Sequence, residues 1–535
     1  MFPQYILTGG GGKQWTELIH NGPLFPPPYT PHNITISYNG MKLKLSSTAE
    51  EYITMYCRYI DTPYVLNPRF NKNFLLDWNK ELDIKITNIN EVDLTNIIKY
   101  LEEIKESKKS ITKEMKEKIK KEVDAFEEPY KYCYVDGSRM KVGNYKVEPP
   151  GIFLGRGDHP KLGRIKTRIN PDDVIINISK KVPIPKPNVN GRWKEVIHNN
   201  MVVWLATWVD NISNKNKYVF TSMESIFKSK SDMEKFDLAK KLKKSINHIR
   251  TTYYNDMKSG DNTTKRQHAT ALYLIDNLAL RVGGIKDTKE KADTVGVTSL
   301  RVEHITLYDD NIIRLDFLGK DSVRYCKKVK VDPVVYDNIK EFIDNRNKKD
   351  LLFNSITSTS LNQYLESMMP DLTAKVWRTY NASMLFQKEL DRVDKNKMTK
   401  LPETERINYL ISIFNQANTM VAILCNHQKN VSGNLSTTID KIDSMIKKLK
   451  KMKTKTTNKE KLLKINAKII ILKMKKETKI KMKNVSLGTS KNNYIDPRII
   501  FAFMKRYNIP EDKLFNTALL TRFEWARNVD DYYSF

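Results

Sequence analysis

The chain has 535 residues, of which 40% are hydrophobic and 29% charged, a composition typical of a soluble globular protein of about two to four domains. No apolar run approaches the roughly 18 residues that a membrane-spanning helix needs, and the N-terminal MFPQYILTGGGG resembles neither a secretory signal nor a transit peptide, so we expect an intracellular protein. Its cysteines are scattered, which indicates reduced, mostly buried thiols rather than disulfides or a metal site.

The charge balance is the strongest feature of the composition. Lys and Arg number 92 against 62 Asp and Glu, which gives a net charge of +30 and a pI near 9.6. Such a surface attracts polyanions. Nucleic acid is the first candidate partner and a membrane surface the second, although no apolar anchor accompanies the basic segments. Charge alone does not separate a DNA enzyme from a passive DNA coat.

The N-terminal half alternates between irregular and regular segments. Residues 1–32 are rich in Gly and Pro and predict extended chain. Residues 33–100 mix short strands and helices, and residues 100–127 predict charged helices with a break near Ser110. A second Pro- and Gly-rich stretch, at 148–192, predicts a connector.

Residues 200–430 predict a large, mostly helical domain with a strand insertion. A helix at 264–282 has one apolar face and stops at Gly283-Gly284. Alternating apolar residues at 312–331 predict a hairpin with Gly319 in its turn. The apolar stripe of the helix that precedes His427 predicts that this histidine lies on its inward face.

The last hundred residues change character twice. Residues 441–484 hold 17 lysines and three acidic residues. Ile439, Ile442, Ile446 and Leu449 follow 3-4-3 spacing, and Ile465, Ile469 and Leu472 repeat the pattern after a polar break. This pattern predicts an antiparallel coiled-coil hairpin, whose lysines are either solvated or in contact with a phosphate backbone. Farther on, Asp496-Pro497 predicts a helix start two residues after Tyr494, with partial positive charge near the phenol.

A tyrosine that cleaves a phosphodiester needs particular helpers. The phenol, with an ordinary pKa near 10, needs a positive surround. Arg and His donors match the charge that gathers on the non-bridging oxygens, and Lys can protonate the leaving 5′ oxygen. Sufficient cations make a metal unnecessary. Composition does not choose among the chain's 92 basic residues.

Long motifs make that choice. The chain resembles the eukaryotic-type DNA topoisomerase I (type IB) family from about residue 15 to residue 535, in GPLFPPPY, EPPGIFLGRGDHPKLG, LALRVGG with KADTVGVTSLRVEHI, DFLGKDSVRY, LTAKVWRTYNAS, AILCNHQ and LGTSKNNYIDPR, in this order. The resemblance implies five catalytic residues: Arg281 and Arg378 as the two arginines, Lys320 as the general acid that also touches a base in the minor groove, His427 as a phosphate donor and Tyr494 as the nucleophile.

Each of these residues also has an ordinary structural interpretation. Arg281 would cap a helix end, His427 would be a satisfied core histidine, Lys320 would be a solvated turn lysine, and Tyr494 would be one more aromatic residue. The joint match of all the motifs favours the catalytic interpretation. The resemblance then implies a 3′-phosphotyrosyl intermediate, strand rotation and religation, with relaxation of positive and negative supercoils. It implies no ATP and no obligatory metal, with magnesium as a stimulant at most.

Further residues are carried over from the same resemblance. Lys161 and Glu290 match the lips of a DNA clamp, which meet through a salt bridge. Arg156, Asp321 and Asn493 match positions where camptothecin-type inhibitors act, so the resemblance implies sensitivity to that class. Lys166 and Lys375 complete the predicted DNA-binding set.

Two departures from the family's pattern lie near the site. Leu154 and Gly284 stand where the family often has Arg and Asn, which puts the rate and the DNA affinity in doubt, but not the reaction. The family's long, charged N-terminal domain is not expected here. We expect a nuclear protein if the source is cellular, or one of a viral factory or virion if the source is a large DNA virus.

Two other classes compete with this interpretation. A tyrosine recombinase uses similar residues but typically places His three positions before the second arginine, where this chain has Lys375. A non-catalytic DNA-binding protein needs no intact Arg-Lys-Arg-His-Tyr set.

We therefore predict an α+β, bilobed DNA clamp that binds double-stranded DNA largely without sequence preference, as a monomer and without a membrane. A mixed N-terminal cap lobe is followed by a mainly helical, tyrosine-recombinase-like catalytic lobe, an antiparallel coiled-coil linker and a small helical C-terminal domain. The predicted boundaries are 1–32 with 111–195 (core subdomain I), 33–110 (core subdomain II, the cap), 196–430 (core subdomain III, catalytic), 431–485 (linker) and 486–535 (C-terminal domain).

Overall fold

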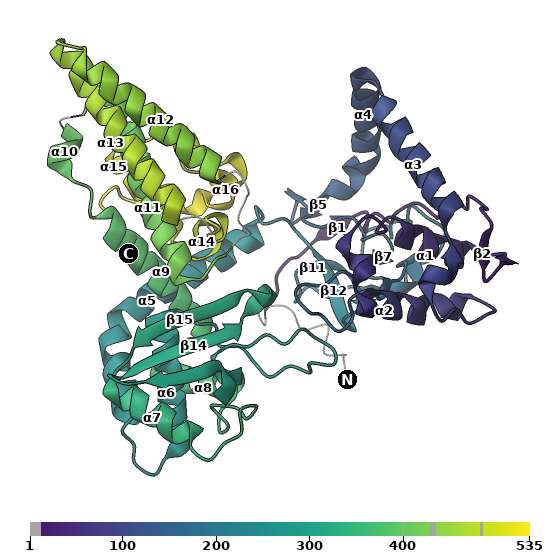
Figure 1. Ribbon diagram of the computed structural model, residues 1–535, viewed down its shortest axis with the longest axis horizontal. Coiled ribbons are helices and arrows are strands. Elements are labelled where there is room, and N and C mark those ends of the chain that lie inside the picture. Colours follow the sequence, from purple (N-terminus) through teal and green to yellow (C-terminus); the bar gives the residue numbers. More distant parts are fainter. Residues whose placement is uncertain (1–11, 400, 429–434, 482–484) are drawn as a thin grey trace. The chain divides into compact units, whose positions relative to one another are not determined.

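The computed structural model describes residues 12–399, 401–428, 435–481 and 485–535. They mix helix and sheet, as the sequence predicts (Figure 1). Two compact units contain them. The first unit comprises the described residues up to Lys228 together with Asp287–Asp293, and the second comprises Ser229–Lys286 and Thr294–Phe535. None of the described helices is long and apolar enough to cross a membrane.

Short strands build the first unit. One antiparallel sheet contains β1 (Leu18–His20), β5 (Tyr132–Val135) and β6 (Ser138–Lys141), and another contains β3 (Met41–Leu43), β2 (Ile36–Tyr38) and β4 (Val92–Asp93). A four-stranded sheet has the order β10 (Glu195–Ile197), β9 (Ile175–Asn177), β11 (Trp204–Asp210) and β12 (Lys215–Phe220). A last pair consists of β7 (Gly151–Ile152) and β8 (Ile165–Lys166). The predicted boundary at 195/196 lies inside this unit, because β11 pairs with β9.

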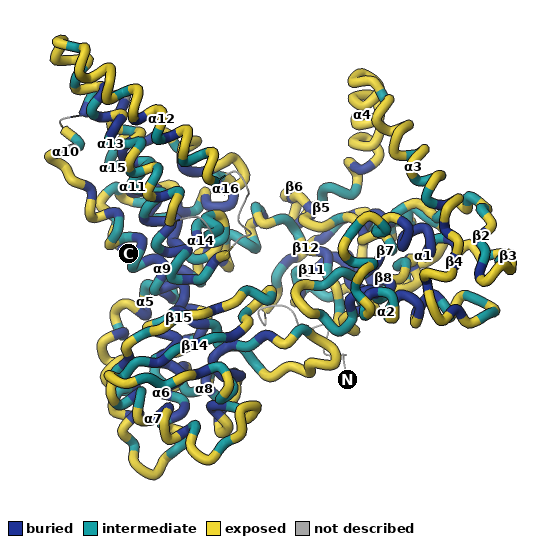
Figure 2. The backbone as a smooth tube through the Cα atoms, viewed as in Figure 1, coloured by how far each residue is buried: buried dark blue, intermediate teal, exposed yellow. Residues whose placement is uncertain are grey.

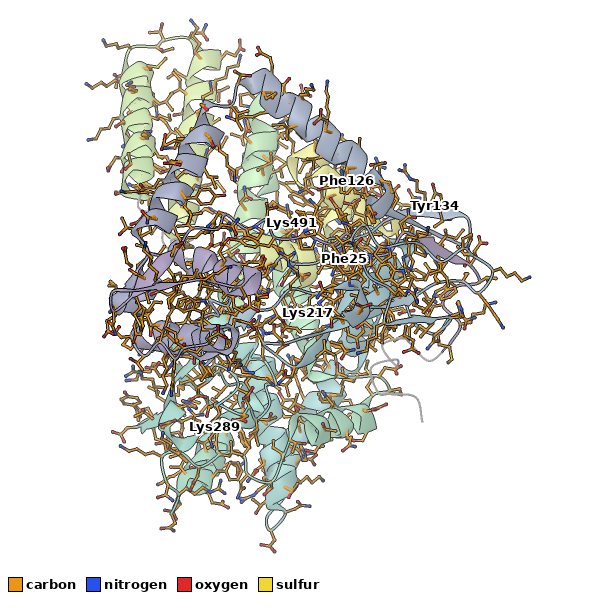
Figure 3. All side chains as sticks on the ribbon, turned by 90° about the vertical axis from the view of Figure 1, so that its right-hand side faces the viewer. Phe25, Phe126, Tyr134, Lys217, Lys289 and Lys491 are labelled. Carbon is orange, nitrogen blue, oxygen red and sulfur yellow. The ribbon has the colours of Figure 1, made fainter. Side chains whose placement is uncertain are left out.

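Four helices complete the first unit: α1 (Ser47–Cys57), α2 (Pro68–Trp78), α3 (Thr95–Ser110) and α4 (Lys113–Lys131). The break predicted near Ser110 is confirmed, since Thr112 caps α4 by accepting from the backbone of Met115. The helices α1 and α2 enclose a core with fully buried Phe70 and Trp78. By contrast, α4 is largely exposed (Figure 2), and its Phe126 (labelled in Figure 3) is 59% exposed.

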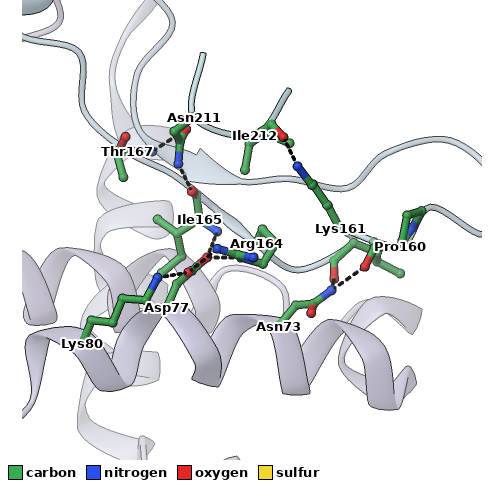
Figure 4. A network of polar contacts seen from close by, with 11 residues as sticks. Asn73, Asp77, Lys80, Pro160, Lys161, Arg164, Ile165, Thr167, Asn211 and Ile212 are labelled. Atoms are coloured by element: carbon green, nitrogen blue, oxygen red, sulfur yellow. Dashed lines mark hydrogen bonds and ion pairs between the residues drawn. The ribbon is translucent and has the colours of Figure 1, made fainter. Parts of the chain in front are cut away.

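A buried carboxylate joins α2 to the segment that contains β8 (Figure 4). Asp77 accepts hydrogen bonds from Arg164 Nε at 2.6 Å, Arg164 Nη2 at 2.8 Å and the Ile165 backbone at 3.0 Å. Burial alone would raise the pKa of Asp77, but these donors hold it below its ordinary value. At Gly163 the backbone has φ +92 and lies so close to Phe70 that a Cβ would stand 2.2 Å from the Phe70 carbonyl oxygen. This anchoring fixes the loop that carries Lys161.

One continuous apolar core fills the second unit. Its elements are α5 (Ile226–Asp256), α6 (Thr263–Leu278), the antiparallel sheet of β13 (Ile305–Tyr308), β14 (Ile312–Leu318) and β15 (Arg324–Lys330), then α7 (Pro333–Ile343), α8 (Ser358–Met368), α9 (Ala374–Leu390), α10 (Lys395–Thr399), α11 (Glu403–Leu424), α14 (Gly488–Asn493), α15 (Pro497–Arg506) and α16 (Thr517–Arg522). The predicted hairpin is confirmed as β14 and β15.

Two predicted helix ends are wrong. The helix α6 stops at Leu278, because Ala279 takes a left-handed conformation with φ 50, so Arg281 lies beyond the helix instead of within its last turn. The helix α11 ends at Leu424, so His427 lies in the segment that follows and not on the inward face of the helix. Apolar residues continue at helical spacing beyond the end of each helix, so the sequence pattern does not reveal where the two helices stop.

The lysine-rich region forms two helices, α12 (Leu435–Thr454) and α13 (Lys459–Lys481), which lie side by side (Figure 1). They pack through Ile442, Ile446, Ile465 and Ile469, with Leu449 and Leu472 beside them. The apolar contact is narrow, and most of the surface of both helices is exposed (Figure 2). A regular coiled coil stays a prediction, and the predicted boundary at 430/431 lies outside the described residues.

Candidate active site

Tyr494 lies between two helices of the C-terminal region, directly after α14 and before α15. Ser383 of α9 holds its backbone: the Ser383 hydroxyl donates to the Tyr494 carbonyl at 3.2 Å and accepts from the Asp496 N–H at 3.0 Å. Lys491 (Figure 3) anchors α14, because it donates to the Leu514 carbonyl at 2.7 Å. The tyrosine is therefore fixed from α9 and from the C-terminal segment.

The helix α15 begins with Asp496 and Pro497 as predicted, but its N-terminus carries a buried negative charge. The fully buried Asp496 carboxylate caps this end by accepting from the Arg498 backbone at 2.9 Å, and it also pairs with the Arg498 guanidinium. The negative charge offsets the helix dipole. Positive charge near Tyr494 must therefore come from side chains.

Arg378 and His427 supply that surround. The Arg378 guanidinium carbon lies 5.3 Å from the centre of the Tyr494 ring, and the His427 ring centre lies 5.4 Å from it. Arg378, on α9, donates to the Cys425 carbonyl, while His427 Nδ1 lies 2.8 Å from the Ser490 hydroxyl on α14. The segment 425–428 thus joins α9 to α14 beside the tyrosine.

Two backbone hydrogen bonds connect the segment of Arg281, through residues 295–297, to the end of β14, which precedes Lys320. The Arg281 carbonyl accepts from the Val297 N–H at 2.9 Å, and the Val295 N–H donates to the Leu318 carbonyl at 2.8 Å. Lys320 follows in the turn between β14 and β15, where its side chain is exposed and has no hydrogen-bond partner among the described residues. The turn is tied to the histidine segment as well, because Gln428 Nε2 donates to the Arg324 carbonyl at 2.9 Å.

Gly283 and Gly296 lie in close contact, which allows the segment of Arg281 to pack against residues 295–297. Gly283 has φ +73, and a Cβ there would stand 2.4 Å from Gly296. Only glycine permits both the left-handed backbone and the contact. The pair sets the position of Arg281 relative to β14.

The electrostatics of His427 reflect its neighbours. Burial, together with the charges of Arg378 and Arg281, lowers the pKa of His427 to about 3. The imidazole is therefore neutral at pH 7 and carries one N–H. A Ser490 hydroxyl that donates to Nδ1 leaves that proton on Nε2, and we assign this tautomer.

Buried donors meet beside the phenol without protein partners. Nε and Nη1 of Arg378 and Nε2 of His427 are buried and have no hydrogen-bond partner within the described residues. Native proteins seldom leave such groups unsatisfied. The oxygens of a phosphate would satisfy all of them beside Tyr494, which suits the charge of a phosphoryl-transfer transition state.

The low pKa of His427 makes a testable contribution to stability. Between pH 7 and pH 5 an unfolded chain protonates this histidine near 6.5, whereas the folded protein does not, so stability falls as the pH falls. We expect His427→Gln to remove up to about 2 kcal/mol of that fall. Denaturant unfolding at both pH values measures it.

His248→Gln, at an exposed position, is the matched control and should leave the pH dependence as it is in the wild type. Other buried histidines such as His20, whose pKa burial lowers to about 4, act in the same direction in every variant. Identical pH dependence in His427→Gln and the wild type would contradict the burial of the histidine between two arginines.

The remaining predicted residues divide between the units. In the first unit, Lys161 donates to the Ile212 carbonyl at 2.6 Å and forms an ion pair with Glu290. Lys166, on β8, pairs with Glu148, and Arg156 is exposed.

In the second unit, Lys375 is exposed at the start of α9, and Asp321 has φ 65 in the turn beside Lys320. Asn493 precedes Tyr494 and donates to the Thr489 carbonyl at 3.2 Å. The described residues contain no cluster of three or more His, Cys, Asp or Glu that would hold a metal ion.

Sequence reasoning missed the two serines. Ser383 lies five residues after Arg378, and Ser490 four residues before Tyr494, inside the quoted motifs, yet each acts on a segment far away in the chain. Their presence within long matched motifs was the only available signal.

Comparisons with known proteins identify the family of the chain. Residues 13–221 match the family described as "Eukaryotic DNA topoisomerase I, DNA binding fragment", residues 224–460 match "Eukaryotic DNA topoisomerase I, catalytic core", and residues 466–535 match "C-terminal topoisomerase domain". The catalytic-core match contains Arg281, Lys320, Arg378 and His427, and the C-terminal match contains Tyr494.

Relatives that align with nearly the whole chain are named DNA topoisomerase 1 as well. DNA topoisomerase 1 of Caenorhabditis elegans is 41% identical over 546 residues, covering 96% of this chain and 67% of that protein. DNA topoisomerase 1 beta of Arabidopsis thaliana is 41% identical over 562 residues, covering 99% and 60%. DNA topoisomerase 1 of Homo sapiens is 39% identical over 555 residues, covering 97% and 72%. The chain therefore spans between 60% and 72% of the length of these relatives.

Buried arginine and histidine donors beside a tyrosine suit chemistry on a phosphodiester. The chain belongs to the eukaryotic DNA topoisomerase I family. It is a type IB DNA topoisomerase, an isomerase that relaxes DNA.

Proposed function

We propose that Tyr494 is the nucleophile and that the cut is reversible. Its oxygen forms a bond to the DNA phosphorus while the bond to the 5′ oxygen breaks. Lys320 gives a proton to that oxygen, and the phenol proton leaves to water. The cut strand rotates about its partner, and the 5′-hydroxyl then attacks the 3′-phosphotyrosine and reverses each transfer. The covalent bond conserves the energy, so positive and negative supercoils relax without ATP.

This proposal rests on one observation. Tyr494 lies beside donors of Arg378 and His427 that have no hydrogen-bond partner among the described residues. We assign Arg378 and Arg281 to the non-bridging oxygens, where charge grows in the transition state. A neutral His427 donates from Nε2. The guanidinium of Arg378, held by the Cys425 carbonyl, and that of Arg281 supply positive charge without a metal ion, so none is obligatory in this proposal.

DNA binding in this proposal is largely independent of sequence. Lys166, Arg156 and Lys375 contact phosphates or the groove, which makes the affinity strongly salt-dependent. Lys161 and Glu290, which form an ion pair within the first unit, are the proposed lips of a DNA clamp. The helices α12 and α13 form the coiled-coil linker that precedes the C-terminal domain. One monomer encloses one duplex.

Arg156, Asp321 and Asn493 border the site of camptothecin-type inhibitors in this proposal. The drug is then expected to raise the level of covalent complex, and an unchanged level would contradict the assignment. We propose a nuclear location, and the relatives above, which are eukaryotic, give no support to a viral one. Fluorescence microscopy of the tagged chain tests the location.

Relaxation of supercoiled plasmid in EDTA without ATP tests the proposed function. We expect complete relaxation of both positively and negatively supercoiled DNA, with an optimum at intermediate salt because phosphate contacts weaken as salt rises. Magnesium should change the rate by a small factor only. Strict dependence on magnesium or ATP would contradict the mechanism.

A further inference from the structure

A buried tyrosine on β15 has a hydroxyl that the mechanism does not yet use. Tyr325 is 4% exposed, and its ring stacks on Phe317 with the ring centres 5.2 Å apart. Its hydroxyl is buried and has no hydrogen-bond partner in the described part of the chain. Packing explains the ring but not the oxygen, since phenylalanine would fill the same space.

Two other tyrosines of this unit, the buried Tyr253 and the half-buried Tyr364, have partnered hydroxyls. The Tyr253 hydroxyl donates to Asp276 at 2.8 Å, and the Tyr364 hydroxyl donates to Asp256 at 2.7 Å. A buried polar group left without a partner weakens the folded state. An unpartnered hydroxyl therefore points to a contact that forms only during the reaction.

Tyr325 lies beside the catalytic segment. The preceding carbonyl, of Arg324, accepts from Gln428 Nε2 at 2.9 Å and from Asn426 Nδ2 at 3.4 Å, which flank His427 on both sides. Arg378 donates to the carbonyl of Cys425 in the same segment. One four-residue stretch thus holds β15 and the guanidinium of Arg378.

The chemistry of the two groups is complementary. Arg378 has buried Nε and Nη1 donors without partners among the described residues and needs an acceptor. Burial raises the pKa of Tyr325, so the phenol stays protonated at working pH. The charge of Arg378 opposes that rise, which shows that the two groups interact electrostatically. A neutral phenol oxygen accepts an N–H without neutralising the charge that the phosphate needs.

We propose that Tyr325 is a positioning residue for Arg378: its oxygen accepts one guanidinium N–H and orients the others toward the phosphate. The inference rests on the proposed function. It adds a member to the site that acts through an arginine and does not touch DNA.

The test is Tyr325→Phe, which keeps the ring and removes the oxygen. We expect the single-turnover cleavage rate to fall about tenfold or more, as for loss of a hydrogen bond to a charged group. Affinity for duplex DNA, measured with Tyr494→Phe present to prevent cleavage, should stay the same. The melting temperature should stay the same or rise, because the oxygen lost had no partner.

Tyr364→Phe is the matched control. It removes a hydroxyl that is bonded to Asp256, so it should lower the melting temperature and leave cleavage unchanged. If Tyr325→Phe instead lowers the melting temperature and leaves the cleavage rate unchanged, the hydroxyl is structural and the inference is wrong.

A double-mutant cycle shows whether Tyr325 acts through Arg378. In an Arg378→Lys background, Tyr325→Phe should change the cleavage rate less than about twofold. The same factor in both backgrounds would overturn the positioning role. If wild-type protein forms covalent adducts and Tyr325→Phe cleaves equally fast, the inference alone fails. If the wild type forms no adduct, the proposed function fails with it.

Discussion

Replacing Tyr494 with phenylalanine is expected to abolish covalent protein–DNA adducts and plasmid relaxation. Phenylalanine lacks the attacking oxygen but keeps the ring, so its packing beside His427 and Arg378 persists. The backbone contacts with Ser383 also persist. We therefore expect unchanged folding and DNA affinity with complete loss of chemistry. Denaturation of the reaction with detergent, followed by detection of protein on radiolabelled DNA, measures the adduct.

Tyr532→Phe is the matched control, because Tyr532 belongs to the same C-terminal region and is 78% exposed. It should relax plasmid at the wild-type rate. Relaxation by Tyr494→Phe would show that another group attacks the phosphorus, and the assignment of the whole site would then fail. Loss of activity in both variants would point to damage in the C-terminal region and would equally remove support for Tyr494.

Local sequence patterns predicted those elements that are determined by residues close together in the chain. Strand alternation around Gly319 predicts β14 and β15, because a half-buried strand alternates its side chains. Asp496-Pro497 predicts the start of α15, because the cap acts within three residues. Isoleucine spacing picks out the contact between α12 and α13.

Hydrogen bonds between residues far apart in the chain could not be predicted from the sequence. Ser383 contacts Tyr494 across 111 positions of the chain and Ser490 contacts His427 across 63, and no spacing rule predicts such contacts. The left-handed Ala279 ended α6 although alanine favours helix, so tertiary packing prevailed over propensity. Family resemblance supplied the identities of the proposed catalytic residues, and the structure supplied their surroundings.

The two departures have different structural contexts. Leu154 packs against the apolar core around α1 and α2, so its side chain stabilises the first unit where a charged residue would face outward. Gly284 lies in open surroundings, and a Cβ at this position would have Ser358 Oγ as its nearest neighbour, at 3.7 Å. A larger polar residue would therefore fit at 284, whereas a charged one at 154 would lose apolar packing.

Lys320→Ala is expected to slow cleavage of ordinary DNA by about 10²–10⁴-fold, the usual contribution of a general acid. The side chain is exposed in a turn and has no protein partner among the described residues, so the fold should persist. A substrate with sulfur in place of the 5′ bridging oxygen should restore most of the lost rate, because a thiol, with an ordinary pKa near 8.5, leaves without a proton. Single-turnover cleavage of the two substrates measures the effect.

The sulfur substrate separates two roles that a lysine can have. If Lys320 only attracts the phosphate by its charge, the alanine variant will be slowed equally on both substrates. If it gives a proton to the leaving oxygen, only the ordinary substrate will be slowed. Lys330→Ala, at the exposed far end of β15, is the control and should cleave both substrates as the wild type does. Equal slowing of Lys320→Ala on both substrates would leave the enzyme without an identified acid. The proton would then have to come from water or from another group near the turn.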